Sequence, residues 1–324
     1  MLAQASMGAP AKGSWGSYQA RWGEGNKGIR YPLGAMRLIF GERDVPYQEA
    51  RVVVLPVPYD LSLSFLPGAR RGPEAILLAS RELEPFLLEL SVAPEEVGIY
   101  AAEPVPFVAG SAEKSHILIR EAALAHLLAG KFVVALGGDH SITHPLVMAH
   151  REALGEFSIL HIDAHADLYP EWQGSVYSHA SPFYRLLQEG FPLVQVGIRA
   201  MDQDSLGLAR EKGVGLFPAH RIHREGLPLK AILAALGRRV YISLDFDALD
   251  PAFMPSVGTP LPGGLSYRQV VDLLEAVFQE KEVVGMDFVE LSPNGQFHAE
   301  MTAAQLVYHA IGLKGLQAGW LSPL

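Results

Sequence analysis

The sequence contains no cysteine, and this absence narrows the chemistry that it can support. None of the 324 residues can form a disulfide or supply a thiolate to a metal. A metal site in this chain must therefore use carboxylate oxygens and imidazole nitrogens, a set of ligands that suits manganese.

Two further features are missing. No apolar run approaches the roughly 18 residues that a membrane-spanning helix requires, and no apolar segment of the secretory type is present, so we expect a cytoplasmic protein with no membrane partner. The chain also has fewer basic than acidic residues: it contains 26 Lys and Arg residues and 35 Asp and Glu residues, which gives a net charge of −9. This balance argues against nucleic acid as a partner and favours small cationic molecules.

Strand-like and helix-like segments alternate from Arg51 onward, which predicts βαβ units and a parallel sheet. Apolar runs rich in β-branched residues predict strands at 51–57, 131–136, 157–162, 193–198, 214–217, 239–245 and 282–290. Helical patterns lie between them, from about Pro73, at 112–130, 144–153, 202–212, 228–236 and 266–280, and from about residue 299. No long linker interrupts this alternation, so we expect a single domain over residues 36–324.

Residues 1–35 do not follow this pattern. They are rich in Gly, Ala and Ser, carry two of the four tryptophans, and show neither helical nor strand periodicity. We expect a leader ahead of the folded unit, which would begin near Met36. The alternative is a flexible N-terminal arm that packs on a neighbouring subunit.

Three short runs carry ligand-type side chains at the ends of predicted strands. GGDHS at 137–141 contains His140, DAHAD at 163–167 contains Asp163, His165 and Asp167, and SLDFDALDP at 243–251 contains Asp245 and Asp247. In an extended backbone, residues at i, i+2 and i+4 share one face. Alone, each Asp is as well explained as a turn former or helix cap. Together, four carboxylates at one sheet edge would repel one another without cations, so the set predicts a two-metal site.

These runs resemble the ureohydrolase family of arginases and agmatinases, and they are most similar to the agmatinase branch. The resemblance covers roughly residues 50–315 and includes the segments at 58–76, 178–183, 250–266 and 285–293. It implies a three-layer α/β/α sandwich on a mainly parallel sheet, two Mn²⁺ ions per chain, and a homotrimer or homohexamer. The implied reaction cleaves a guanidinium group to urea and an amine, as in polyamine biosynthesis.

The resemblance also implies roles for particular residues. Asp163 and Asp245 would bridge both ions, His140 and Asp167 would complete one ion's ligands, and His165 and Asp247 the other's. Asp167 would also hold the attacking oxygen. Glu290 would bind the guanidinium group, and His179 would pass protons to the leaving amine, although SHASPF stands here where agmatinases commonly have HGTPF. We expect Asp139 to orient the imidazole of His140.

The loop at 168–183 guides the prediction of substrate. It has no asparagine for an α-carboxylate and offers Tyr169, Glu171, Trp172 and Tyr177 to an amine tail. Agmatine or an aminopropyl-agmatine is therefore favoured over arginine, guanidinobutyrate or formiminoglutamate. Two other classes remain open, a zinc-dependent acetylpolyamine deacetylase and a non-catalytic relative, although no expected metal ligand is missing.

Overall fold

The computed structural model describes residues 40–62 and 64–324, so the leader or arm expected over residues 1–35 lies outside the described residues. Within this part of the chain, eight strands form one sheet in the order β2-β1-β3-β8-β7-β4-β5-β6, and every neighbouring pair is parallel. The strands are β1 (Val52–Val57), β2 (Ile99–Ala101), β3 (Phe132–Gly137), β4 (Ser158–Ile162), β5 (Leu193–Val196), β6 (Gly215–Phe217), β7 (Arg239–Asp245) and β8 (Glu282–Val289).

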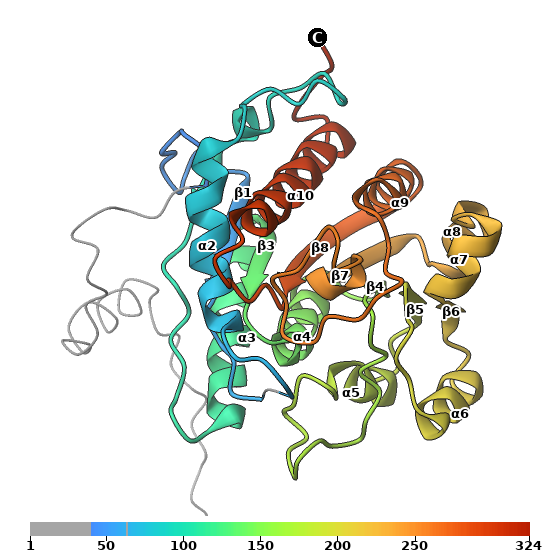
Figure 1. Ribbon diagram of the computed structural model, residues 1–324. Helices are drawn as coiled ribbons and strands as arrows, with labels where there is room; N and C mark the ends of the chain where they lie inside the picture. Colours follow the sequence, from blue (N-terminus) through green and yellow to red (C-terminus); the bar gives the residue numbers. More distant parts are fainter. Residues whose placement is uncertain (1–39, 63) are drawn as a thin grey trace, which may run out of the picture. The chain divides into compact units, whose positions relative to one another are not determined.

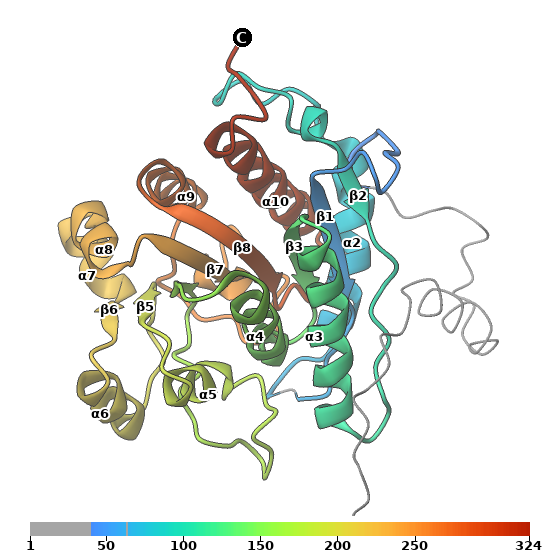
Figure 2. The ribbon, with the colours of Figure 1, turned by 180° about the vertical axis from the view of Figure 1, so that it is seen from behind.

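Helices cover both faces of this sheet. Side by side on one face lie α2 (Gly72–Ala79), α10 (Phe297–Gln317), α9 (Tyr267–Glu280) and α8 (Leu229–Ala235), as Figure 1 shows. The opposite face, seen in Figure 2, carries α3 (Ala112–Leu128), α4 (Thr143–Leu154) and α5 (Pro182–Gln188). Near the β6 edge lie α6 (Gln203–Glu211) and α7 (Ala219–Glu225). The predicted three-layer α/β/α sandwich is confirmed.

Alternation of side chains along β1 explains why the sheet needs two helical layers. Val52 and Val54 belong to one hydrophobic core, whereas Val53 and Leu55 belong to the other. Successive side chains of a strand point to opposite faces, so a run of four buried apolar residues must be covered on both sides. The first core includes side chains of α9 and α10, and the second includes side chains of α3 and α4.

Local signals place several helix ends as predicted. Ser266 and Gln269 form a reciprocal capping box at the start of α9, and the side chain of Asp202 accepts a hydrogen bond from Ser205 N at the start of α6. Pro73 occupies the first turn of α2, where its missing N–H leaves no hydrogen bond unmade.

Some elements were not predicted. The three-residue β2 and the seven-residue α5 and α7 are too short to show a clear period. Five short 3-10 helices also escaped prediction: η1 (Ala69–Arg71), η2 (Ser80–Glu82), η3 (Pro94–Val97), η4 (His140–Ile142) and η5 (Phe246–Ala248). No helix among residues 40–62 and 64–324 is both long and apolar enough to cross a bilayer.

The four central strands, β3, β8, β7 and β4, end at one edge of the sheet. The segment after β3 carries His140, the segment after β4 carries Asp163, His165 and Asp167, and the one after β8 begins with Glu290. Asp245 is the last residue of β7. Open α/β sheets bind ligands at this edge, so the fold gathers the three sequence motifs where a site is expected.

Candidate active site

The hydrogen bonds of His140 orient its imidazole so that the Nδ1 lone pair faces a group of carboxylates. Its Nε2 lies 2.9 Å from Ser243 Oγ, and Ser243 Oγ donates to Asp287 Oδ1 at 2.7 Å. Because the serine proton is directed to Asp287, Ser243 accepts the Nε2 proton of His140. The other nitrogen, Nδ1, is buried and makes no hydrogen bond.

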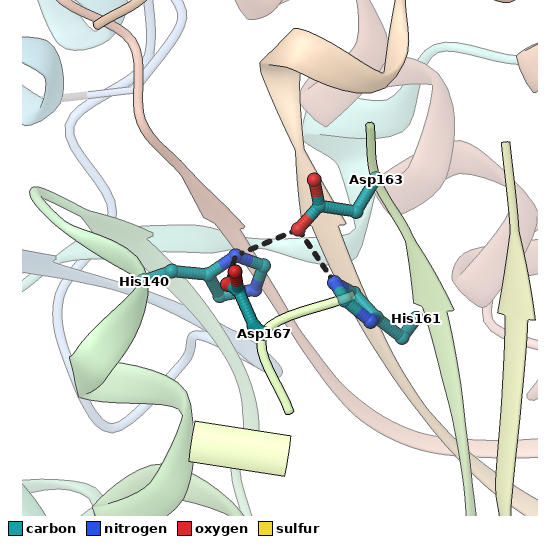
Figure 3. Close-up of side chains that lie close together, drawn as sticks. All are labelled: His140, His161, Asp163 and Asp167. Carbon is teal, nitrogen blue, oxygen red and sulfur yellow. Dashed lines mark hydrogen bonds and ion pairs between the residues drawn. The ribbon is translucent and has the colours of Figure 1, made fainter. Parts of the chain in front are cut away.

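Three carboxylates surround this nitrogen. His140 Nδ1 lies 3.1 Å from Asp163 Oδ2, 3.1 Å from Asp245 Oδ2 and 3.3 Å from Asp167 Oδ2. Figure 3 shows the side chains of His140, Asp163 and Asp167 pointing toward one another. A lone pair that faces three carboxylate oxygens at this distance is repelled unless a proton or a metal cation lies among them. This arrangement fits a divalent metal ion held by oxygen and imidazole ligands.

A second group of ligand-type atoms adjoins the first. His165 Nδ1 lies 3.0 Å from Asp247 Oδ2 and 3.6 Å from Asp163 Oδ1. The two oxygens of Asp163 therefore face different histidines, His140 and His165. Asp163 thus occupies the position that a carboxylate bridging two cations would require.

The carboxylates at this edge destabilise one another's charges. Burial, followed by the charges of Asp247 and Asp163, raises the pKa of Asp245 well above its ordinary value. Burial and the charge of Asp163 raise the pKa of Asp167 to about 6. Positive ions would remove this repulsion, which is a second sign that the residues fit metal ions.

The backbone that carries these residues has one feature that the sequence did not predict. β4 ends at Ile162, so DAHAD follows the strand as predicted, but Asp167 has a φ of 51°, which the sequence did not indicate. His165 forms an isolated parallel bridge to Ala200, and the side chains of Asp163, His165 and Asp167 lie at one site. Left-handed backbone costs a non-glycine residue about 1 kcal/mol or more, and such strain concentrates at functional sites.

His161 is a site residue that the sequence analysis missed. Gln195 Nε2 donates to His161 Nδ1 at 2.9 Å, and His161 Nε2 donates to Asp163 Oδ2 at 2.6 Å (Figure 3). Burial lowers the pKa of His161 to about 4, so this histidine is a neutral donor that orients Asp163. The ring of Phe183, from the SHASPF run, stacks on it with centroids 3.6 Å apart. The sequence did contain a sign of this role, because His161 lies two residues before Asp163 and side chains at i and i+2 of a strand share one face.

Glu290 is tied to the turn that carries His140. Glu290 Oε1 accepts from His140 N at 2.8 Å, and Glu290 N donates to Gly138 O at 2.8 Å. The residue has a φ of 66°, which turns the chain at the end of β8. Burial, followed by the charge of Asp139, raises the pKa of Glu290 well above its ordinary value, so the carboxyl group favours a cationic partner.

The expected role of Asp139 was wrong, because its carboxylate contacts Ser62 and Ser141 instead of the imidazole of His140. Ser243 supplies the partner of that ring.

A cavity of about 220 Å³ opens from these residues to the surface. Its inner wall includes Asp167, Asp245, Asp247, His165 and Glu290, with His179 beside them. The rest of its wall is mainly apolar and aromatic, formed by Phe65, Leu66, Tyr169, Trp172 and Met201, with the hydroxyl groups of Ser62, Ser64, Ser205 and Thr259 among them. No Arg, Lys or Asn lines the cavity among the described residues.

Two residues expected to bind a substrate tail do not line this cavity. Glu171 is exposed, and the ring of Tyr177 packs edge-on to His116 at 5.1 Å, with the guanidinium of Arg185 4.7 Å above it. Trp172 does line the cavity, with Tyr169, whose ring lies 5.0 Å from that of Trp172.

Comparisons with known proteins agree with this geometry. The model of the Arginase family matches residues 50–312. The chain belongs to the arginase family. The resemblance to ureohydrolases that the sequence motifs indicated is thus confirmed, and the chain is a hydrolase of the ureohydrolase type.

Individual relatives cover nearly the whole described chain. It is 89% identical over 287 residues to an N(1)-aminopropylagmatine ureohydrolase of Thermus thermophilus, covering 89% of this chain and 98% of that protein. A protein of the same description from a Synechocystis species is 35% identical, covering 88% of this chain and 96% of that one. The crystal structure of a hypothetical agmatinase from Burkholderia thailandensis superposes with a TM-score of 0.77 at 31% identity, covering 85% and 89% of the two chains.

Proposed function

We propose that this enzyme hydrolyses the guanidinium group of N1-aminopropylagmatine, and of agmatine as a shorter substrate, to urea and an amine in polyamine biosynthesis. The observation that carries the proposal is the cavity. It starts at a set of carboxylates that suits a guanidinium group and two cations, and it opens between mainly apolar and aromatic walls that carry no Arg, Lys or Asn side chain among the described residues. The printed description of the 89% identical Thermus thermophilus relative supports the same substrate.

We propose two Mn²⁺ ions as the cofactor. His140 and Asp167 would hold one ion, His165 and Asp247 the other, and Asp163 and Asp245 would contact both. When bound, a pair of divalent cations lowers the pKa of water toward neutrality and so supplies the nucleophile. Ser243 and His161 would keep His140 and Asp163 in the orientation that this ligand set requires.

Glu290 would hold the guanidinium group. One of its oxygens accepts from the backbone of His140, which fixes the carboxylate while the cavity remains accessible to it. Hydrogen bonds between a carboxylate and a planar guanidinium are charge-assisted and directional. This contact would orient the guanidinium carbon toward the inner carboxylates.

His179 would carry a proton to the leaving amine. Burial lowers its pKa to about 4, so the imidazole is neutral near pH 7 and does not repel a cationic substrate. A neutral imidazole can accept a proton and release it to the amine nitrogen as the carbon–nitrogen bond breaks.

The outer cavity would select the tail. Tyr169 and Trp172 offer aromatic faces to an ammonium group and its methylenes. An α-carboxylate would lose water there without meeting an Arg, Lys or Asn side chain, which costs several kcal/mol. Since each 1.4 kcal/mol is tenfold, arginine should be disfavoured by about 100-fold or more.

The experiment is a urea-release assay with aminopropylagmatine, agmatine, arginine and guanidinobutyrate under one buffer and one Mn²⁺ concentration. We expect both amine-tailed substrates to exceed the other two by about 100-fold in kcat/KM. Arginine turnover equal to that of the amines would show that the enzyme is an arginase. Acetate release from an acetylpolyamine, with no urea from any guanidine, would assign it to the deacetylases, and no turnover at all would indicate a non-catalytic relative.

We also propose that the chain assembles into a homotrimer or homohexamer, as the family resemblance implies. Light scattering at micromolar concentration should give a mass of at least three chains, and a monomer mass would contradict this.

A further inference from the structure

Two chain segments that are distant in sequence meet at the carboxylate of Asp139. This side chain is fully buried, and both of its oxygens are occupied. Oδ1 accepts from Ser141 N at 3.1 Å and from Ser141 Oγ, whereas Oδ2 accepts from Ser62 N and from Ser62 Oγ, both at 3.0 Å. Asp139 therefore holds Ser62 through its backbone and its side chain together.

Ser62 extends this connection to the substrate loop. Its hydroxyl proton is directed to Asp139, so its lone pairs are available on the other side, where Ser62 Oγ accepts from His179 N at 2.8 Å. Ser62 Oγ also lies 3.4 Å from His179 Nδ1. On the far side of the ring, Ser64 Oγ lies 2.7 Å from His179 Nε2. Ser62 and Ser64 thus contact both the backbone and the ring of His179.

That segment is itself fixed on the turn that precedes His140. Asp139 N donates to Tyr59 O at 2.7 Å, and Gly138 N donates to Val57 O at 3.0 Å. The two backbones approach so closely that a Cβ on Gly138 would lie 1.8 Å from Tyr59 O. The position of Ser62 therefore follows the position of the His140 turn.

We propose that Asp139 and Ser62 are positioning residues that set the location of His179 relative to His140 and Glu290. The proposal rests on the proposed role of His179 as proton carrier. The same short turn then fixes all three groups: it carries His140, it binds Glu290 through His140 N and Gly138 O, and it holds His179 through Asp139 and Ser62.

A carboxylate at position 139 suits this role because all four of its contacts are donors. A carboxylate accepts at both oxygens, whereas asparagine would turn an NH₂ group toward the donors of Ser62 or of Ser141. Asp139→Asn should therefore release one of the two serines even though its shape is unchanged.

The test uses urea-release kinetics of the Mn²⁺-loaded enzyme with aminopropylagmatine for Ser62→Ala, His179→Ala and the double variant. Ser256→Ala is the matched control, because the hydroxyl of Ser256 also joins two loops, donating to Asn294 Oδ1 at 2.9 Å. A displacement of about 1 Å can lower a rate by about 100-fold. We expect Ser62→Ala to lower kcat by about 10- to 100-fold, with KM changed less than threefold and the manganese content unchanged.

The double variant separates positioning from a general structural effect. In the His179→Ala background, adding Ser62→Ala should lower kcat by less than a further twofold, because the residue that Ser62 positions is already gone. An equal loss in both backgrounds would overturn the proposal, and so would a Ser62→Ala variant as active as Ser256→Ala.

The proposed function has a separate outcome in this experiment. If His179→Ala alone keeps wild-type kcat, the proton-carrier role is wrong and the positioning proposal is overturned with it. If His179→Ala is impaired and Ser62→Ala is not, only the positioning proposal is overturned. Asp139→Asn serves as the second variant, and its kcat should fall together with that of Ser62→Ala.

Discussion

Replacing Ser243 by alanine should weaken metal binding without removing any metal ligand. Ser243 is fully buried in β7, accepts the Nε2 proton of His140 at 2.9 Å and donates to Asp287 at 2.7 Å. In the variant, His140 can place its proton on Nδ1 and donate it to the surrounding carboxylates. Metal binding would require Nδ1 to be deprotonated again, which leaves the Nε2 proton buried without an acceptor.

The size of the effect follows from that unmade hydrogen bond. A buried polar group left unpaired costs about 1–3 kcal/mol, which corresponds to roughly a 10- to 100-fold loss of affinity at 1.4 kcal/mol per tenfold. Changes to groups that orient metal ligands typically have effects of this size. The loss should fall on metal affinity, because the protein without metal has an alternative way to satisfy the imidazole.

Calorimetric titration of the metal-depleted protein with Mn²⁺ measures this directly. Ser158→Ala is the matched control, since Ser158 is also a buried strand serine that donates to Arg239 O at 3.2 Å and accepts from Gly237 N at 3.0 Å. It lies at the start of β4, away from the edge that carries the site. Both variants should lose stability, but only Ser243→Ala should lose Mn²⁺ affinity. Equal Mn²⁺ affinities in the two variants would refute the reasoning.

Three other changes have defined expectations. Glu290→Gln should lower kcat/KM by about 10- to 100-fold in urea-release assays, because a charge-assisted hydrogen bond worth about 1.5–3 kcal/mol is lost. The control, Glu171→Gln, should keep a kcat/KM near that of the wild type. Equal losses in the two variants would contradict the placement of Glu290. Trp172→Ala should lower kcat/KM for aminopropylagmatine by about 2- to 30-fold, because a cation–π contribution of about 0.5–2 kcal/mol is lost, whereas Tyr177→Ala should not lower it. An equal loss in both variants would restore the expectation from sequence. Gly138→Ala should destabilise the fold by about 3 kcal/mol or more in denaturant melts, because its Cβ would lie 1.8 Å from Tyr59 O. The control is Gly207→Ala in α6, which should not destabilise the fold because its Cβ would meet nothing within 4 Å. A stable Gly138→Ala protein would contradict the close approach.

The strands and the long helices of this enzyme could be predicted from sequence because each has a strong local signal. The buried run at 51–57 corresponds to β1 (Val52–Val57), and the capping box at Ser266 marks the start of α9. The order of the strands had no such signal. β8 follows β7 along the chain but lies between β7 and β3, and that pairing depends on contacts between residues about 150 positions apart, such as Val134 and Met286.

The site divides in a similar way. The ligand-type residues at the strand ends, such as His140 and Asp245, could be predicted because each of the three motifs follows an apolar run that predicts a strand. The left-handed backbone of Asp167 could not be predicted, because nothing in the DAHAD sequence marks it. His161 was missed because a histidine within an apolar strand is usually a packed core residue, although it continues the two-residue spacing of Asp163, His165 and Asp167.

The loop at 168–183 shows where composition alone is insufficient. Tyr169, Trp172 and Tyr177 were equivalent in the sequence, since the loop has no period that assigns its side chains to a face. In the structure the first two line the cavity, and Tyr177 packs on His116 instead.

The central claim, that the ends of β3, β4 and β7 form one site for two metal ions, is tested most directly by metal stoichiometry. Elemental analysis of the Mn²⁺-loaded protein, after removal of free metal, should give two ions per chain. The same measurement on Asp163→Asn should give fewer than one, because Asp163 faces both His140 and His165. A single tightly bound ion in the wild-type protein, or two ions retained in Asp163→Asn, would contradict the account.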